Sequence, residues 1–285
     1  MKSQPNELSS LSRYLTYLVG ILFAIVGLIL FFAPGLVSAN FAWKVTPFVT
    51  MTIGGWCLGT AAYALLSARI WRWSLVFACL IYLWVFGVLE TGVLALHSDR
   101  VTLNSPIAWL YTLTLVLSVV AAALGILDWL RLRPDLKPEG RPLTPVLRLT
   151  AILFAAFVLF LALFAMIAPT SKTVTEGRIF PESLSVFTIH AFGAFYLSLS
   201  LSALSLLGLK GRSPGIIYTW SGLVLLVPIL LAALVNLDKF DFTARPGGLL
   251  YIGTYVVALV AALAIVLYDR RQHGAQPEQR LLTQP

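Results

Sequence analysis

Residues 13–34 read RYLTYLVGILFAIVGLILFFAP, and residues 148–169 read RLTAILFAAFVLFLALFAMIAP. Each stretch begins with an arginine, continues as a long apolar run and ends with Ala-Pro. A helix needs about 20 mostly apolar residues to cross the hydrocarbon core of a bilayer. The two stretches therefore predict two membrane-spanning helices, each of which opens one of two similar halves of the chain.

The similarity extends over most of the chain, because residues 12–131 correspond in order to residues 147–271. Apolar helices share letters by chance, so matched prolines, arginines and aspartates are the stronger indication of a repeat. Such matches include Pro106 with Pro246, Arg131 with Arg271 and Asp99 with Asp238. We therefore expect an internal repeat.

The composition places the chain in a membrane. It is 59% hydrophobic and 11% charged, with a mean hydropathy of +0.89, so it has too few charges to coat a water-soluble surface. Lipid offers no partner to an unpaired backbone amide, so the spans should be helices. The apolar runs of spanning length are residues 14–33, 47–67, 74–96, 107–130, 149–168, 186–208, 215–236 and 249–268.

We predict an all-α integral membrane protein whose eight transmembrane helices form two parallel four-helix repeats. Each half has an even number of spans, so both halves enter the membrane in the same direction, around a pseudo-two-fold axis along the membrane normal. The predicted units are a first repeat (1–130), a Pro-rich cytoplasmic linker (131–146), a second repeat (147–271) and a cytoplasmic tail (272–285).

The basic residues predict the orientation. The N-terminus, the loops 68–73, 131–148 and 209–214, and the C-terminal tail carry fourteen Lys and Arg residues, and the opposite loops carry six. Cytoplasmic loops are the basic ones, so both termini should face the cytoplasm of a plasma (inner) membrane. The net charge of +8 is spread over short segments rather than one face, which argues against nucleic-acid binding and leaves the lipid bilayer as the expected partner.

Two ionisable residues inside the spans are candidates for a ligand site, because charges at membrane depth are costly and are usually functional. Glu90 and His190 both lie toward the outer ends of their spans, and their repeat counterparts are Ile229 and Met51. Both therefore break the repeat, and we expect them to approach each other or to face a common cavity. The structural alternative is that Glu90 forms a hydrogen bond with a neighbouring helix and that His190 simply lies at the interface between membrane and water.

His97 is a third ligand-binding candidate, two helical turns after Glu90 on the same face. Imidazole and carboxylate groups can bind a transition metal, but none of the three candidates is spaced to fix metal geometry on one helix. We therefore expect no metal site. We also expect no cofactor and no catalytic residues, since the P-loop, dinucleotide and HExxH motifs are missing from the sequence.

Small and aromatic residues suggest structural roles. Gly55 and Gly59 form a small-xxx-small pair that should let a neighbouring helix approach the second span closely, and we expect the second and sixth spans to be central. Tryptophans near the span ends should be interfacial anchors: Trp43, Trp71, Trp73, Trp109 and Trp129.

The outer loop Phe41-Ala-Trp-Lys-Val-Thr-Pro47 resembles an F-A-W-x-[IV]-x-P element of uncharacterised bacterial multi-pass membrane proteins, and residues 179–185 are a degenerate copy. Lys44 departs from the small residue or proline usual in that element. The resemblance implies a bacterial membrane protein and no particular activity.

Three function classes remain open. The first is a carrier or binder of a small neutral or lipidic molecule between the two halves, near Glu90 and His190. The second is a structural or accessory subunit of a larger membrane complex, which would contact other membrane subunits. The third is an intramembrane enzyme, which ranks last because the sequence offers no nucleophile, base and metal set.

Overall fold

The computed structural model describes residues 6–136, 142, 144–167, 180, 182–208 and 211–274. Within these residues, eight helices are long and apolar enough to cross a membrane, which confirms the predicted all-α fold. They are α1 (Ser10–Phe32), α3 (Pro47–Ile70), α4 (Trp73–Leu96), α5 (Pro106–Leu132), α6 (Pro145–Met166), α7 (Val186–Ser205), α8 (Ser213–Val235) and α9 (Gly247–Gly274). The short elements are α2 (Pro34–Val37), η1 (Ser38–Asn40), η2 (Ser98–Arg100), η3 (Leu206–Gly208) and η4 (Leu237–Lys239).

Most of the long helices begin in the same way. A serine or threonine side chain accepts a hydrogen bond from a backbone amide of the first turn, which satisfies a donor that would otherwise have no partner. In three cases proline follows, which suits the first helical position because its φ angle is already helical. The capping residues are Ser9, Thr46, Ser105, Thr144 and Ser185.

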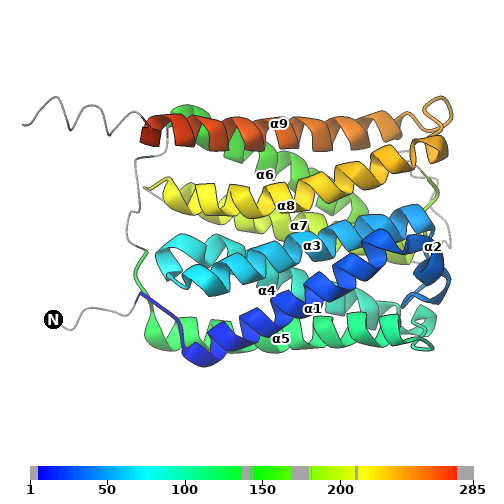
Figure 1. The fold of residues 1–285 in the computed structure, drawn as a ribbon, viewed down its shortest axis with the longest axis horizontal. Coiled ribbons are helices and arrows are strands. Elements are labelled where there is room, and N and C mark those ends of the chain that lie inside the picture. The colour runs from blue at the N-terminus through cyan, green and yellow to red at the C-terminus, as the bar shows by residue number, and fades with distance from the viewer. Residues whose placement is uncertain are drawn as a thin grey trace, which may run out of the picture.

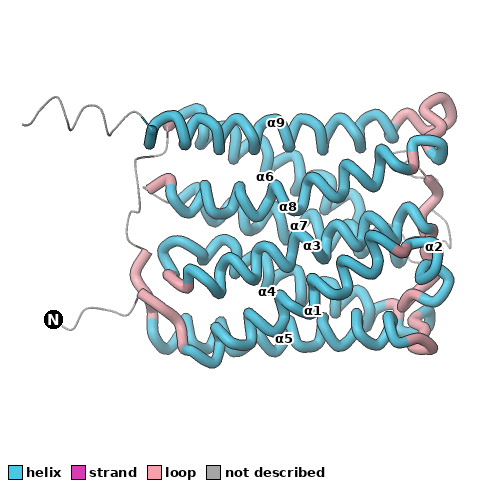
Figure 2. The backbone as a smooth tube through the Cα atoms, viewed as in Figure 1, coloured by secondary structure: helices cyan, strands magenta, loops and turns pink. Residues whose placement is uncertain are grey.

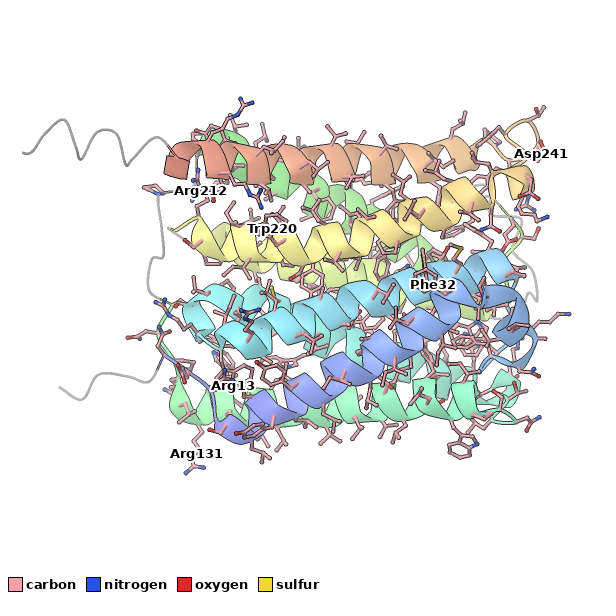
Figure 3. All side chains as sticks on the ribbon, in the orientation of Figure 1. Arg13, Phe32, Arg131, Arg212, Trp220 and Asp241 are labelled. Carbon is pink, nitrogen blue, oxygen red and sulfur yellow. The ribbon has the colours of Figure 1, made fainter. Side chains whose placement is uncertain are left out.

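The long helices run side by side along one axis, and the connections lie at the two ends of the bundle (Figures 1 and 2). We call the end where α1 begins, α5 ends, α6 begins and α9 ends the linker end, and the opposite end the far end. Arg13, Arg131 and Arg212 lie toward the linker end and Asp241 lies at the far end (Figure 3). The charged side chains therefore mark the two ends that would meet water.

Helix packing occurs in corresponding pairs. In the two halves, α1 packs on α3 as α6 packs on α7, and α4 packs on α5 as α8 packs on α9. Between the halves, α3 packs on α8 and α4 packs on α7, which are again corresponding pairs. Two pairs break the pattern: α1 packs on α5 and α3 packs on α4, whereas the corresponding pairs, α6 with α9 and α7 with α8, are not closely packed. Superposition of the halves by a two-fold rotation stays a prediction.

The second and sixth spans lie at the centre of the bundle, as predicted. The buried share of the apolar stretch is 78% in α3 and 61% in the sixth span, Val186–Gly208. In α9 it is 17%. Gly59 lies directly against Leu225 of α8, and Gly55 lies against Ile229 of the same helix. The predicted small-residue pair therefore packs the first half against the second.

The tryptophan prediction is partly wrong. Trp109 and Trp129 are exposed on the helix surface, as expected of interfacial anchors. Trp43, Trp71 and Trp73 are buried instead: Trp43 stacks on Phe187, Trp71 donates to the Leu8 carbonyl and Trp73 stacks on Trp84. The span-end position that suggested an anchor does not distinguish a ring facing lipid from a ring facing the core.

Candidate functional site

The two histidine candidates are in direct contact at the far end of the bundle. His97 follows the last residue of α4, and His190 lies in the first turns of α7. Their ring nitrogens, Nε2 of His97 and Nδ1 of His190, are 2.9 Å apart, and both side chains are buried. One imidazole donates to the other, so the pair joins the third span of the first half to the second span of the second half.

Aromatic rings hold the histidine pair in place. The Phe187 ring stacks between Trp43 on one side, with centroids 4.5 Å apart, and His97 on the other, with centroids 4.9 Å apart. The Trp43 indole also donates to the hydroxyl of Thr188 over 3.1 Å. We call Trp43, His97, Phe187, Thr188 and His190 the far-end cluster.

The loop that precedes α3 and the loop that precedes α7 meet beside this cluster. Thr46, from the first element, donates a hydrogen bond to the carboxylate of Glu182, from the degenerate copy. Burial raises the pKa of Glu182, and the Thr46 hydroxyl and the charge of Arg245 partly offset that rise. These two loops, which correspond in the predicted repeat, are thus in contact across the two halves.

Charged groups near the histidines affect their protonation. Burial lowers the pKa of His97, and the neighbouring His190 and Arg100 lower it further, while Asp99 acts in the opposite direction. The lowered pKa favours the neutral form of the His97 imidazole. Arg100 and Asp99 form an exposed ion pair of their own at 3.6 Å.

Glu90 is also buried, in the interior of α4. Its Oε1 atom has no hydrogen-bond partner among the described residues, and its carboxyl group lies near Cys57 of α3 and Tyr111 of α5. Glu90 thus faces the interior of the first half. That Glu90 and His190 share a cavity stays a prediction, since the contact that the structure provides for His190 is with His97.

In the described part of the chain, histidines, cysteines and carboxylates do not gather in a group of three or more that could hold a metal ion. The two cysteines, Cys57 and Cys79, are buried free thiols in the core. The far-end cluster is a hydrogen-bonded and aromatic contact between the halves.

A cavity of about 170 Å³ lies elsewhere, inside the second half. It is bounded by α6, α7, α8 and α9, and Tyr63 of α3 closes its inner side. Most of its lining is aliphatic or small: Leu147, Ala151, Phe154, Leu199, Ala203, Leu206, Leu207, Gly215, Ile216, Gly222, Leu225, Leu226, Ala258, Ala261, Ala262 and Ile265. The interior is thus suited to an apolar group.

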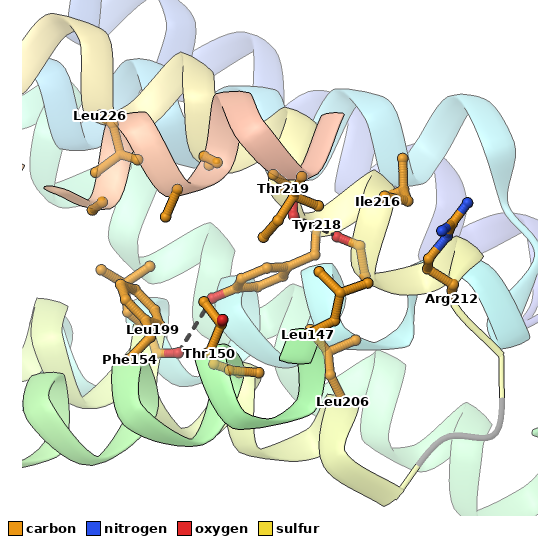
Figure 4. A pocket seen from close by; sticks show the side chains of 18 of the residues that line it. Leu147, Thr150, Phe154, Leu199, Leu206, Arg212, Ile216, Tyr218, Thr219 and Leu226 are labelled. Carbon is orange, nitrogen blue, oxygen red and sulfur yellow. Dashed lines mark hydrogen bonds between the residues drawn. The ribbon is translucent and has the colours of Figure 1, made fainter. Parts of the chain in front are cut away.

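The polar groups of this cavity are mostly satisfied from within the protein. Tyr218 reaches across it, and its hydroxyl is 2.7 Å from the Ser202 hydroxyl and donates to the Leu199 carbonyl over 3.2 Å (Figure 4). Arg212 lies at one end of the cavity and Leu226 at the other (Figure 4). Arg148 also lines the Arg212 end, which is the linker end of the bundle.

The cavity coincides with one of the breaks in the repeat. In the first half, α1 and α5 pack together, whereas the corresponding α6 and α9 are held apart and both line the cavity. The sequence pointed to neither the cavity nor its lining. The available signal was the run of alanines on α9, Ala258, Ala261 and Ala262, which leaves room beside a helix but is also common in closely packed helices.

Comparison of this chain with protein families, with curated proteins and with solved structures finds no match.

Proposed function

We propose that this multi-pass membrane protein binds a small lipidic molecule in the cavity of its second half. The observation that carries the proposal is an apolar cavity beside two helices, α6 and α9, that are not closely packed. Cavities that bind ligands are concave and mostly apolar, with a few polar groups that fix orientation. This cavity has that composition, and its polar groups include Tyr218, Thr150, Thr219 and two arginines.

The size of the cavity suits one hydrocarbon group. An engineered apolar cavity of about 150 Å³ in another protein stays dry and binds benzene. A cavity of about 170 Å³ therefore holds a ring or a few methylene groups, and a longer molecule would extend between α6 and α9 into the bilayer. Each buried methylene would contribute about 0.8 kcal/mol to the binding free energy if the ligand came from water, and less if it came from lipid.

The proposal keeps the expected lipidic ligand and moves its site from between the halves to within the second half. The far-end cluster then serves to fix the two halves against each other around their shared helices. We further propose that the protein lies in a bacterial plasma membrane with its linker end in the cytoplasm, on the distribution of basic residues and on the resemblance of its outer loop. The cavity would then open toward the cytoplasmic leaflet.

Photo-crosslinking tests the binding site. A fatty acid that carries a diazirine along its chain should label the purified protein in detergent, and peptide mapping should place the label on α6, α8 or α9. Ala261→Phe places a ring in the cavity and should remove most of the labelling. Ala123→Phe is the matched control, because Ala123 is an exposed alanine of α5, and it should label as the wild type does.

Labelling spread evenly over the lipid-facing surface, and equal in the Ala261→Phe and Ala123→Phe variants, would refute the proposal. Both variants should first be shown to remain monodisperse, so that lost labelling reports on the cavity rather than on folding.

A further inference from the structure

Two corresponding arginines of the repeat differ in their partners. Arg13, at the start of α1, donates from Nε to the Ala68 carbonyl over 2.8 Å and from Nη2 to the Arg69 carbonyl over 3.4 Å. It thereby binds carbonyls at the end of α3, where a positive charge is favourable. Arg148, its counterpart on α6, is exposed, and its side chain makes no hydrogen bond or ion pair with any other described residue.

The other arginine at the cavity mouth is already neutralised. Arg212 is buried, forms an ion pair with Asp269 and lies over the ring of Tyr268 at 5.6 Å. Among the described residues that line the cavity, Arg148 therefore offers the positive charge that a ligand at the mouth would meet. An arginine binds carboxylate and phosphate groups through two parallel hydrogen bonds, so it favours an anionic ligand over a neutral one.

The lining of the cavity follows the path of an acyl chain that has its head at this end, and the cavity itself holds a few of that chain's methylene groups. The lining residues of α8 extend from Arg212 to Leu226, which is about 21 Å at 1.5 Å per residue. The hydrocarbon core of a bilayer is about 30 Å thick, so one leaflet accounts for roughly 15 Å. The cavity thus begins at the polar linker end and reaches the depth at which the chains of one leaflet end.

We propose that the ligand is an acyl chain with an anionic head, a carboxylate or a phosphate, whose chain enters the cavity and whose head binds Arg148. This inference rests on the proposed function, because it specifies the ligand of the same cavity. The two sources of such a ligand are a free fatty acid and an anionic phospholipid.

Three single-chain probes test the inference: oleate, oleoyl lysophosphatidylglycerol and oleyl alcohol. Their binding to the purified protein in a neutral detergent is measured by displacement of a fluorescent fatty acid. Arg148→Gln should weaken the binding of the anionic probes about tenfold, the scale of one charge-assisted hydrogen bond, and should leave oleyl alcohol unchanged. Arg131→Gln, which removes an exposed arginine of α5 at the same end, is the control and should change none of the three.

The outcomes separate this inference from the function on which it rests. Loss of oleate binding alone in Arg148→Gln supports a fatty acid as the ligand, and loss of both anionic probes supports the shared anionic head. If Ala261→Phe abolishes binding while Arg148→Gln binds oleate as the wild type does, the head-group inference is wrong and the proposed function stands. If Ala261→Phe leaves all three probes bound, both are wrong.

Discussion

Replacement of Gly59 by alanine tests the packing between the two halves. A β-carbon at this position would lie 2.4 Å from the Leu225 β-carbon, and a side-chain rotation cannot move that atom away. At Gly92, in the neighbouring helix α4, a β-carbon would meet nothing within 4 Å. Both substitutions gain the same helix propensity of about 1 kcal/mol. The difference in stability between the two variants therefore measures the overpacking of Gly59→Ala against Leu225 alone, which should cost about 1–3 kcal/mol.

Thermal unfolding in detergent measures this difference. At about 2–4 °C per kcal/mol, Gly59→Ala should unfold roughly 2–12 °C below Gly92→Ala, and Gly92→Ala should be at least as stable as the wild type. The fraction of each variant that remains monodisperse after heating gives the comparison. Equal midpoints for the two variants would refute the close approach of α3 and α8 at Gly59.

Three further predictions follow from the far-end cluster and the topology. Burial and His190 lower the pKa of His97 in the folded protein, so its contribution to stability should be complete above about pH 6.5 and should be lost as the pH drops below that value. Between about pH 7.5 and 5.5, the Tm of the wild type should therefore fall more than that of His97→Gln. Equal losses of Tm would count against a contribution of His97 to the pH dependence of stability. Phe187→Ala, which removes the central ring of the stack, should cost about 3–5 kcal/mol in a thermal or denaturant titration, and a loss below 1 kcal/mol would contradict the packing described. A membrane-impermeant thiol reagent added to intact cells should label a cysteine placed at Asp99 and not one placed at Leu136, and the reverse result would invert the orientation.

The fold could be predicted from the sequence because lipid imposes few solutions. An apolar run of about 20 residues has to satisfy its backbone internally, so length and hydropathy alone predicted all eight spans. The central position of α3 and α7 followed from their small residues. Length and hydropathy do not indicate which way an individual ring points, and Trp43 is buried with its ring stacked on Phe187.

The candidate site could be predicted only in part. Polarity inside an apolar span selected His190, and the position two helical turns after Glu90 selected His97. The structure brings these two histidines together. The sequence did not indicate that they contact each other, because that depends on how α4 and α7 pack across the halves. The cavity could not be predicted, since it arises from a difference in spacing between α1–α5 and α6–α9 that is set by many side chains together.

An experimental map of the protein in lipid nanodiscs that contain anionic lipid would test the binding site most directly. We predict elongated density between α6 and α9 that runs beside Tyr218 and ends at the Arg148 guanidinium. Closely packed α6 and α9 with no space between them, or an open cavity whose density stays away from Arg148, would contradict the proposal.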